Sequence, residues 1–310
     1  MKRLKFNPRN TFFLPLSRIP YTVLCILFFV SCEKDITIDL NDPEPKIVVE
    51  ASIENNQPPF VVLSNSLNYF SKINPEILAA SFVHNAEIFI SDGTRTHKLV
   101  EDSIVDVQGY TLYFYTNNRN DPSTAIFGQL GVSYSLEINT GGEVFKANTT
   151  IPDTTKIIDS LWWEPIPVID PEDSNKTKLM IKATDRPGYG DYVRYYTKVN
   201  SQPFFPGLNS VYDDQVIDGT TYILPVDRGI NKNVELEEDD VFFTRGDTVT
   251  MKLSAIDKAV YDFWRTSEFS YQSIGNPFSN PVKILSNISN NALGYFGGYG
   301  SQFRTIVISK

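Results

Sequence analysis

The chain has 310 residues, of which 37 are acidic and 28 basic, so its formal net charge at pH 7 is −9. Nucleic acids and anionic lipid surfaces bind proteins through basic faces, and this composition therefore argues against both as partners. The chain has only two histidines and two cysteines, and these do not supply three or four ligands at the close spacing of a zinc site.

The first 31 residues have the pattern of a secretory signal peptide. An apolar stretch at 19–30 follows a basic segment that contains no acid. The bases are Lys2, Arg3, Lys5, Arg9 and Arg18. A membrane-spanning helix needs about 20 apolar residues. The shorter stretch therefore favours a cleaved signal at 1–31.

The predicted signal ends at a cysteine. Residues Phe29-Val30-Ser31-Cys32 resemble a bacterial lipobox, although Phe29 replaces the usual leucine. In that motif the thiol accepts diacylglycerol and the cysteine becomes the new N-terminus. Cleavage would remove Cys25, so Cys32 would remain without a disulfide partner. We therefore predict a lipoprotein whose Cys32 carries acyl chains such as palmitate, which together anchor it in a bilayer. The alternative is a secreted protein with an incidental cysteine.

The residues after Cys32 bear on localisation. Glu33-Lys34-Asp35 resembles a sorting signal that sends some Bacteroidota lipoproteins to the outer face of the outer membrane. Because Ile36 replaces the usual second acid, the periplasmic leaflet stays an alternative. Removal of residues 1–31 takes away five of the 28 bases and no acid, which leaves 23 bases against 37 acids, a formal charge of −14. We predict a surface-exposed acidic body on a tether at 32–45.

Residues 46–152 are predicted to form an N-terminal Ig-like β-sandwich domain. Alternating apolar residues at 46–53 (Ile47, Val49, Ala51 and Ile53) indicate a half-buried strand. Further strands are predicted at 86–91, 110–116, 132–139 and 143–151. Turn signals at 92–93 and 141–142 favour antiparallel pairing.

Residues 153–310 are predicted to form a second β-rich domain with one packed α-helix, so the fold class is mainly β with two sandwich-like domains. Strands are predicted at 178–185, 192–199 and 247–254, and the stretch 201–233 reads as loop. The helix is predicted at 254–272, with Ser254 as N-cap and Asp257 completing a capping box. Its apolar stripe contains Ile256, Val260, Phe263, Trp264 and Tyr271. A partner-binding groove on this helix is the alternative to packing on the second sandwich.

The closing segment carries a resemblance. Residues 253–302 contain GNPF (275–278), PV (281–282), SNI (286–288) and GYFGGY (294–299). This segment is similar to the end of a Bacteroidota lipoprotein family, domain of unknown function 4249. The segments at 45–53, 85–93 and 149–153 fit it too. The resemblance implies an outer-membrane lipoprotein, often encoded beside TonB-dependent transporters, and it implies no reaction or ligand. Within the motif we read the glycines as tight turns that let Tyr295, Phe296 and Tyr299 pack or form a ligand or partner surface.

No catalytic or metal site is predicted from the residue pattern. His84 and His97 read as ordinary polar residues, and the chain lacks a G-x-S-x-G elbow and a phosphate-binding loop. Carboxylates are numerous, but no spacing selects a glycosidase pair. The acidic runs at 213–219 and 235–240 could offer oxygen ligands to calcium. Neither fits an EF-hand loop, so solvated charge is the favoured interpretation, with no cofactor.

Trp162 and Trp163 are adjacent on a predicted extended segment. Neighbours on a strand point to opposite faces, so we expect one in the core and the other exposed or covering the domain joint. An exposed tryptophan would be a ligand surface. Taken with the resemblance, the expected role is a non-enzymatic accessory or ligand-binding component of a TonB-dependent transport system. A structural or adhesive surface lipoprotein and a surface glycan hydrolase are the alternatives.

Overall fold

The computed structural model describes residues 44–310, except for 68–73, 106–108, 155, 168–173, 235, 277 and 281. Most of the predicted tether, the predicted signal peptide and Cys32 lie outside the described residues. Residues 44–310 belong to one compact unit. The account below concerns this unit alone.

The described chain is mainly β, as the sequence predicts. The first half contains β1 (Ile47–Glu54), β2 (Phe60–Asn65), β3 (Glu87–Ser91), β4 (Thr96–Val105), β5 (Thr111–Thr116), β6 (Ser133–Thr140) and β7 (Glu143–Thr150). The second half contains β8 (Lys156–Pro165), β9 (Lys176–Asp185), β10 (Tyr192–Val199), β11 (Phe205–Tyr212), β12 (Thr221–Val226), β13 (Phe243–Thr244), β14 (Thr248–Ile256) and β15 (Leu293–Val307). The helical elements are α2 (Pro75–Ser81), α3 (Lys258–Gln272), and the short 3-10 turns η2 (Pro122–Thr124) and η4 (Glu238–Val241).

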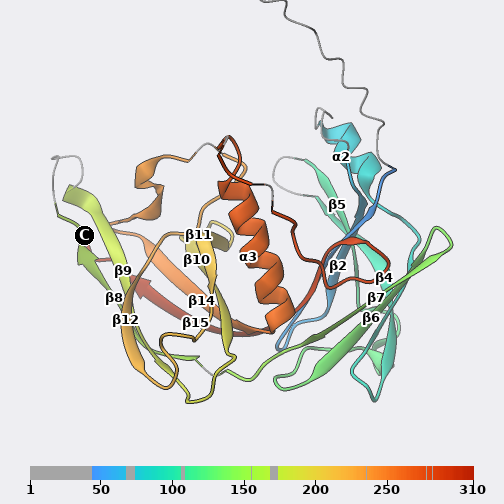
Figure 1. Ribbon diagram of the computed structural model, residues 1–310, viewed down its shortest axis with the longest axis horizontal. Helices are drawn as coiled ribbons and strands as arrows, with labels where there is room; N and C mark the ends of the chain where they lie inside the picture. Colours follow the sequence, from blue (N-terminus) through green and yellow to red (C-terminus); the bar gives the residue numbers. More distant parts are fainter. Residues whose placement is uncertain are drawn as a thin grey trace, which may run out of the picture. The chain divides into compact units, whose positions relative to one another are not determined.

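Two sheets organise these strands. The larger has eleven strands in the order β11-β10-β14-β15-β1-β2-β5-β4-β3-β6-β7. The smaller has the order β12-β9-β13, with β8 also paired to β9. β15 pairs in parallel with β1 and antiparallel with β14 (Figure 1). The first strand of the chain and the last therefore join the two halves within one sheet.

Three groups of buried side chains fill the unit. The first core includes Val49, Ile88, Leu136, Phe145 and Phe296. The second core includes Leu179, Val193, Phe243, Met251 and Ile308. A smaller group under α3 includes Ile256, Val260, Tyr261 and Tyr299. The predicted domain boundary at 152–153 falls between β7 and β8, where the first core gives way to the second along the chain; it stays a prediction.

The predicted helix at 254–272 begins later than expected, at Lys258, and ends at Gln272 as predicted. Ser254 lies in β14, where its Oγ is 2.7 Å from Ser301 Oγ. Asp257 is the N-cap, because its Oδ1 accepts the Val260 amide at 2.9 Å. Pairing of β14 with β10 continues to Ile256, so the sheet overrides the capping signal at Ser254. In the described chain, no helix combines the length and apolarity that crossing a bilayer requires.

The glycine-rich motif forms a strand, which corrects the expectation of tight turns. Residues 293–307 make up β15, and Gly294 pairs with Val49 of β1. Gly294 has a φ of +94°, and a Cβ there would overlap the Val49 carbonyl oxygen. The glycine is needed because backbones approach closely at this point.

Candidate functional site

A largely apolar cavity lies between the two sheets of the C-terminal half. It has a volume of about 550 Å³, within the range of small-molecule sites. The smaller sheet contributes Ile181, Tyr222, Leu224, Pro225 and Val226, and the larger sheet contributes Val193, Tyr195, Val211, Tyr212, Met251 and Leu253. The remaining lining residues are Lys156, Asp213, Val216, Ile217, Asp227 and Tyr261. We call this space the inter-sheet cavity.

Strand alternation positions the aromatic wall of the inter-sheet cavity. Tyr195 is buried on β10, and its ring stacks with that of Tyr212 on β11 with centroids 6.2 Å apart. Gly207 on β11 makes room for Tyr195, because a Cβ at this position would overlap the tyrosine hydroxyl. Burial raises the pKa of Tyr195 and raises the pKa of Tyr222 to about 12. Both phenols are therefore neutral at physiological pH.

The mouth of the inter-sheet cavity is apolar and accessible. Val216 is 92% exposed and Leu224 47% exposed, although both line the cavity. Exposed aliphatic side chains at a concave site are typical of surfaces that bind apolar partners. Asp213 and Asp227 also line the wall. Burial raises the pKa of Asp227, and Asp213 Oδ2 accepts the Tyr261 hydroxyl at 3.1 Å.

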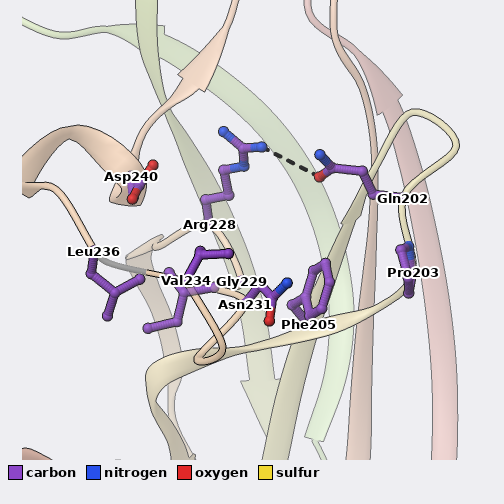
Figure 2. Close-up of a pocket in the computed structure, with 10 residues that line it drawn as sticks. Gln202, Pro203, Phe205, Arg228, Gly229, Asn231, Val234, Leu236 and Asp240 are labelled. Carbon is purple, nitrogen blue, oxygen red and sulfur yellow. Dashed lines mark hydrogen bonds between the residues drawn. The ribbon is translucent and has the colours of Figure 1, made fainter. Parts of the chain in front are cut away.

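A second pocket of about 340 Å³ lies beside the loop that follows β12 (Figure 2). Its walls include Phe205, Val234 and Leu236, together with polar Asp240. Arg228 Nη2 donates to Gln202 Oε1 at 3.3 Å across it. Because it is smaller and has fewer aromatic residues, it offers an apolar ligand less contact than the inter-sheet cavity.

The tryptophan pair lies on β8 and is half-buried at both positions, rather than one buried and one exposed. Trp162 Nε1 donates to Glu164 Oε1 at 3.0 Å. Trp163 packs against the second core, and the Arg245 guanidinium lies 4.8 Å from its ring centre. Neither tryptophan lines the two pockets described above. The prediction that they form a ligand surface stays a prediction.

The aromatic residues of the closing motif lie inside the fold. Phe296 is fully buried in the first core, and Tyr299 is buried under α3, so of the two alternatives, packing or forming a surface, these two side chains pack. Tyr295 is half-buried and its ring stacks on Phe263 with centroids 4.6 Å apart. Trp264 Nε1 donates to the Tyr299 hydroxyl at 3.0 Å. β15 lies in the interior of the large sheet. Its Tyr295 and Tyr299 side chains contact Phe263 and Trp264 of α3 and thereby hold this helix against the sheet.

A buried ion pair supports this aromatic group. The Arg194 guanidinium lies 3.4 Å from the Trp264 ring centre, and its Nη2 is 3.9 Å from Glu268 Oε1 on α3. Ser210 bridges the two charges, since its Oγ accepts from Arg194 Nε and its amide donates to Glu268 Oε2 at 2.9 Å. Such pairs are costly to break on one side only. The arrangement is structural and fixes α3 to β10 and β11.

Both histidines contact neighbouring polar groups. His84 Nδ1 lies 2.5 Å from Glu101 Oε1 at the surface. His97 is buried on β4, with Nδ1 2.6 Å from Thr124 Oγ1 and with Nε2 accepting the Asn118 amide at 3.0 Å. Neither histidine lines the inter-sheet cavity. We assign no catalytic group to this cavity.

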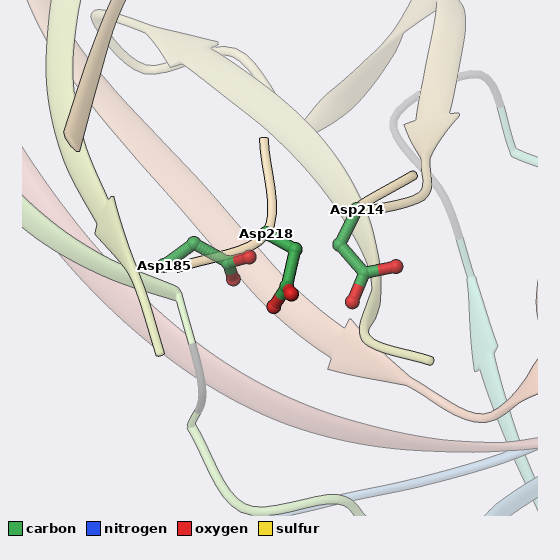
Figure 3. Close-up of side chains that lie close together, drawn as sticks. All are labelled: Asp185, Asp214 and Asp218. Carbon is green, nitrogen blue, oxygen red and sulfur yellow. The ribbon is translucent and has the colours of Figure 1, made fainter. Parts of the chain in front are cut away.

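One cluster of three carboxylates among the described residues could hold a metal ion. Asp185, Asp214 and Asp218 each offer an oxygen, and these oxygens lie within 4.8 Å of one another (Figure 3). Two of the three come from the acidic run at 213–219. The other acidic run, at 235–240, contributes no residue to the group. We call Asp185, Asp214 and Asp218 the aspartate cluster.

The sequence did not reveal the inter-sheet cavity, because two of its strands were hidden. The stretch 201–233 reads as loop, yet it contains β11 and β12, in which Pro206, Gly207 and Pro225 obscure the strand pattern. Those strands lie at the edges of their sheets, where proline is tolerated. The available signal was the β propensity of Thr221, Tyr222 and Ile223.

A family model described as "Domain of unknown function (DUF4249)" matches residues 33–304. The search of curated proteins finds no match.

Proposed function

The chain belongs to the family of domain of unknown function DUF4249, and from this premise we propose that it is a lipid-anchored, non-catalytic binding protein. In this proposal Cys32 carries the lipid and holds the body at the outer membrane, on the cell surface. The inter-sheet cavity takes a small apolar ligand. The protein then acts as an accessory component of a TonB-dependent transport system.

The observation that carries the binding role is the composition of the inter-sheet cavity. Its wall is formed mainly by aliphatic side chains and neutral tyrosines, and its volume of about 550 Å³ suits a small molecule. Lys156 also lines the cavity, but its ammonium is paired with Asp185. The nearby acids Asp213 and Asp227 would disfavour an anionic ligand. A neutral or cationic apolar compound therefore fits best.

Ligand entry at the mouth can be tested with the neutral apolar dye Nile red. Leu224 lines the cavity, whereas its neighbour Ile223 does not, because successive strand residues face opposite sides of a sheet. Leu224→Arg places a charge in the apolar mouth, and we expect it to weaken dye binding at least tenfold, measured by fluorescence titration. Ile223→Arg is the matched control, since Ile223 is similarly exposed at 55%.

Equal dye affinity in the native protein and the Leu224→Arg variant would exclude the inter-sheet cavity as the binding site. Loss of affinity in both variants would point to a general effect of the added charge and would count against the site as well.

The lipid anchor is tested separately by membrane fractionation of cells that produce the chain. Cys32→Ala removes the thiol that would accept the lipid, and we expect the protein to leave the membrane fraction. Cys25→Ala is the matched control, because it removes the other cysteine from within the predicted signal. If Cys32→Ala stays with the membranes as firmly as the native protein, the anchor is disproved.

The transport role can be tested in the same cells. The native protein should co-purify with a TonB-dependent transporter after mild detergent extraction. Recovery without any transporter would favour the alternative of a structural or adhesive surface lipoprotein. Glycan cleavage by the purified protein would favour the hydrolase alternative.

A further inference from the structure

The aspartate cluster is assembled from two segments that meet beside the inter-sheet cavity. Asp185 ends β9, while Asp214 and Asp218 lie in the loop between β11 and β12 (Figure 3). That loop forms one helical turn, because the Asp218 amide donates to the Asp214 carbonyl at 3.0 Å. Residues four apart on such a turn lie on the same side. The Asp185 amide donates to Thr220 O at 2.9 Å and thereby ties β9 to the loop.

Each carboxylate of the cluster uses one oxygen for the protein. Asp185 Oδ1 accepts from Lys156 Nζ at 2.8 Å, and Asp218 Oδ1 accepts the Gly188 amide at 2.7 Å. Asp214 Oδ2 accepts the amides of residues 190 and 191 at 2.8 and 3.0 Å. These bonds hold the carboxylates in place. They leave Asp185 Oδ2, Asp214 Oδ1 and Asp218 Oδ2 for another partner.

The second oxygen of Asp185 is the observation that points to a ligand. The Asp185 side chain is fully buried, and in the described part of the chain its Oδ2 is the one buried side-chain polar atom without a hydrogen-bond partner. A buried carboxylate oxygen without a partner is strongly unfavourable. Here Asp185 belongs to a group whose oxygens converge within 4.8 Å. A cation bound by the three aspartates would provide the partner that Asp185 Oδ2 lacks.

Charge balance favours a divalent ion. Three carboxylates contribute three negative charges, and the buried Lys156 offsets one of them. Asp214 is also buried, whereas Asp218 is partly exposed and leaves a route for the ion and for water ligands. A divalent cation would neutralise the two remaining charges. Without a cation these carboxylates repel one another.

The type and number of the protein ligands favour calcium. All three side chains offer oxygen, which suits calcium or magnesium and disfavours zinc. Calcium binds oxygen at about 2.3–2.6 Å, so two ligands on opposite sides of one ion are about 5 Å apart. The three oxygens lie within 4.8 Å of one another, which is compatible with that limit. Magnesium usually keeps several waters and binds through one or two carboxylates, so three protein carboxylates favour calcium. We propose that Asp185, Asp214 and Asp218 form a calcium site completed by water.

The calcium site would also order one wall of the inter-sheet cavity. Val216 and Ile217 of the same loop line the cavity, and they lie between the two aspartates that bind the ion. Calcium would therefore fix the loop in its ligand-binding conformation. This coupling rests on the proposed function, whereas calcium binding itself does not.

Calcium binding is tested by isothermal titration calorimetry of the full-length protein in detergent after removal of metal with a chelator. We expect one calcium ion per chain, weaker binding of magnesium, and a higher Tm with saturating calcium. Asp218→Asn and Asp214→Asn each keep an oxygen for the loop amides but remove a charge, and we expect affinity to fall at least tenfold. Asp159→Asn is the control, because Asp159 is an exposed acid of β8 outside the cluster.

Near-UV circular dichroism of each variant establishes that it is folded. No calcium binding by the folded native protein would overturn the proposal. Equal affinity in the native protein and both loop variants would also overturn it, since the ion would then bind elsewhere. Nile red titration with calcium or with chelator tests the coupling: equal dye affinity would disprove the coupling and leave the calcium site intact.

Discussion

His97 forms hydrogen bonds through both of its ring nitrogens in the folded protein. These bonds and its burial affect how the free energy of unfolding depends on pH. Nε2 accepts the Asn118 amide at 3.0 Å, so that nitrogen carries no proton. Nδ1 then carries the proton and donates to Thr124 Oγ1 at 2.6 Å. Burial lowers the pKa of His97, while the nearby charge of Asp121 acts in the opposite direction. The folded state therefore holds this imidazole neutral.

The sign of the pH effect follows from the lowered pKa. An unfolded histidine has a pKa of about 6.5, so below that pH the unfolded chain gains a proton that the folded chain resists. The stabilising effect is fully present above the unfolded pKa and is lost as the pH falls through the folded pKa. We expect the free energy of unfolding to decrease between pH 7.5 and pH 5.5.

His97→Gln should reduce this pH dependence. Because His97 is buried, the substitution itself should destabilise the protein by about 1–2 kcal/mol at pH 7.5. Urea unfolding of both proteins at several pH values measures the difference in slope. The other ionisable groups are the same in both proteins, so their contribution cancels in the comparison. A slope unchanged by the substitution would refute the assignment of this pH dependence to His97.

At the scale of single elements, the sequence is a good guide where one face of a strand is buried. Residues 46–53 are predicted as a strand from alternating apolar positions, and β1 spans Ile47–Glu54 with Val49, Ala51 and Ile53 buried. The strands predicted at 132–139 and 143–151 correspond closely to β6 and β7. Alternation works here because antiparallel strands bury one face and expose the other.

The same reasoning fails where tertiary contacts determine the backbone. β8 spans the segment predicted as extended around Trp162 and Trp163, but it pairs with β9 through an irregular register that alternation does not predict. The glycines of β15 suggest turns, although they serve a close approach to β1. Pairing between β1 and β15 joins residues more than 200 positions apart, and no local pattern encodes such a contact. The inter-sheet cavity was missed for this reason, since its walls come from distant strands.

The aspartate cluster was half visible in the sequence. The acidic run at 213–219 suggests oxygen ligands, and Asp214 and Asp218 belong to it. Asp185 is the last residue of the strand predicted at 178–185 and carries no signal of its own. Its place beside the loop depends on pairing between β9 and β12. The unpartnered oxygen of Asp185 is a property of the folded chain and cannot be predicted from composition.

At the scale of the whole molecule, β15 links the two large cores. Phe296 on β15 is buried in the first core, and Ile306 near its other end packs against the second. β15 is also hydrogen-bonded to β1 on one side and β14 on the other. Unfolding of either core would therefore leave one end of β15 without packing, although the other end of the same strand belongs to the remaining core. We expect the described body to unfold as one cooperative unit.

Three phenylalanine substitutions test this expectation. Phe296→Ala removes a fully buried ring from the first core, and Phe243→Ala removes one from the second. Each should cost about 3–5 kcal/mol, which corresponds to a decrease in Tm of about 10 °C for a chain of this size. Phe278→Ala is the matched control, because Phe278 is 94% exposed, and it should leave the Tm unchanged.

Differential scanning calorimetry of the full-length protein distinguishes one unit from two. Under cooperative unfolding, the native protein gives a single transition, and both core variants shift that same transition downward. Two transitions, one sensitive only to Phe296→Ala and the other only to Phe243→Ala, would contradict cooperativity. In that case the halves on either side of residues 152–153 would be independent domains, despite the strand pairing that connects them, because interactions within each core would outweigh those along β15.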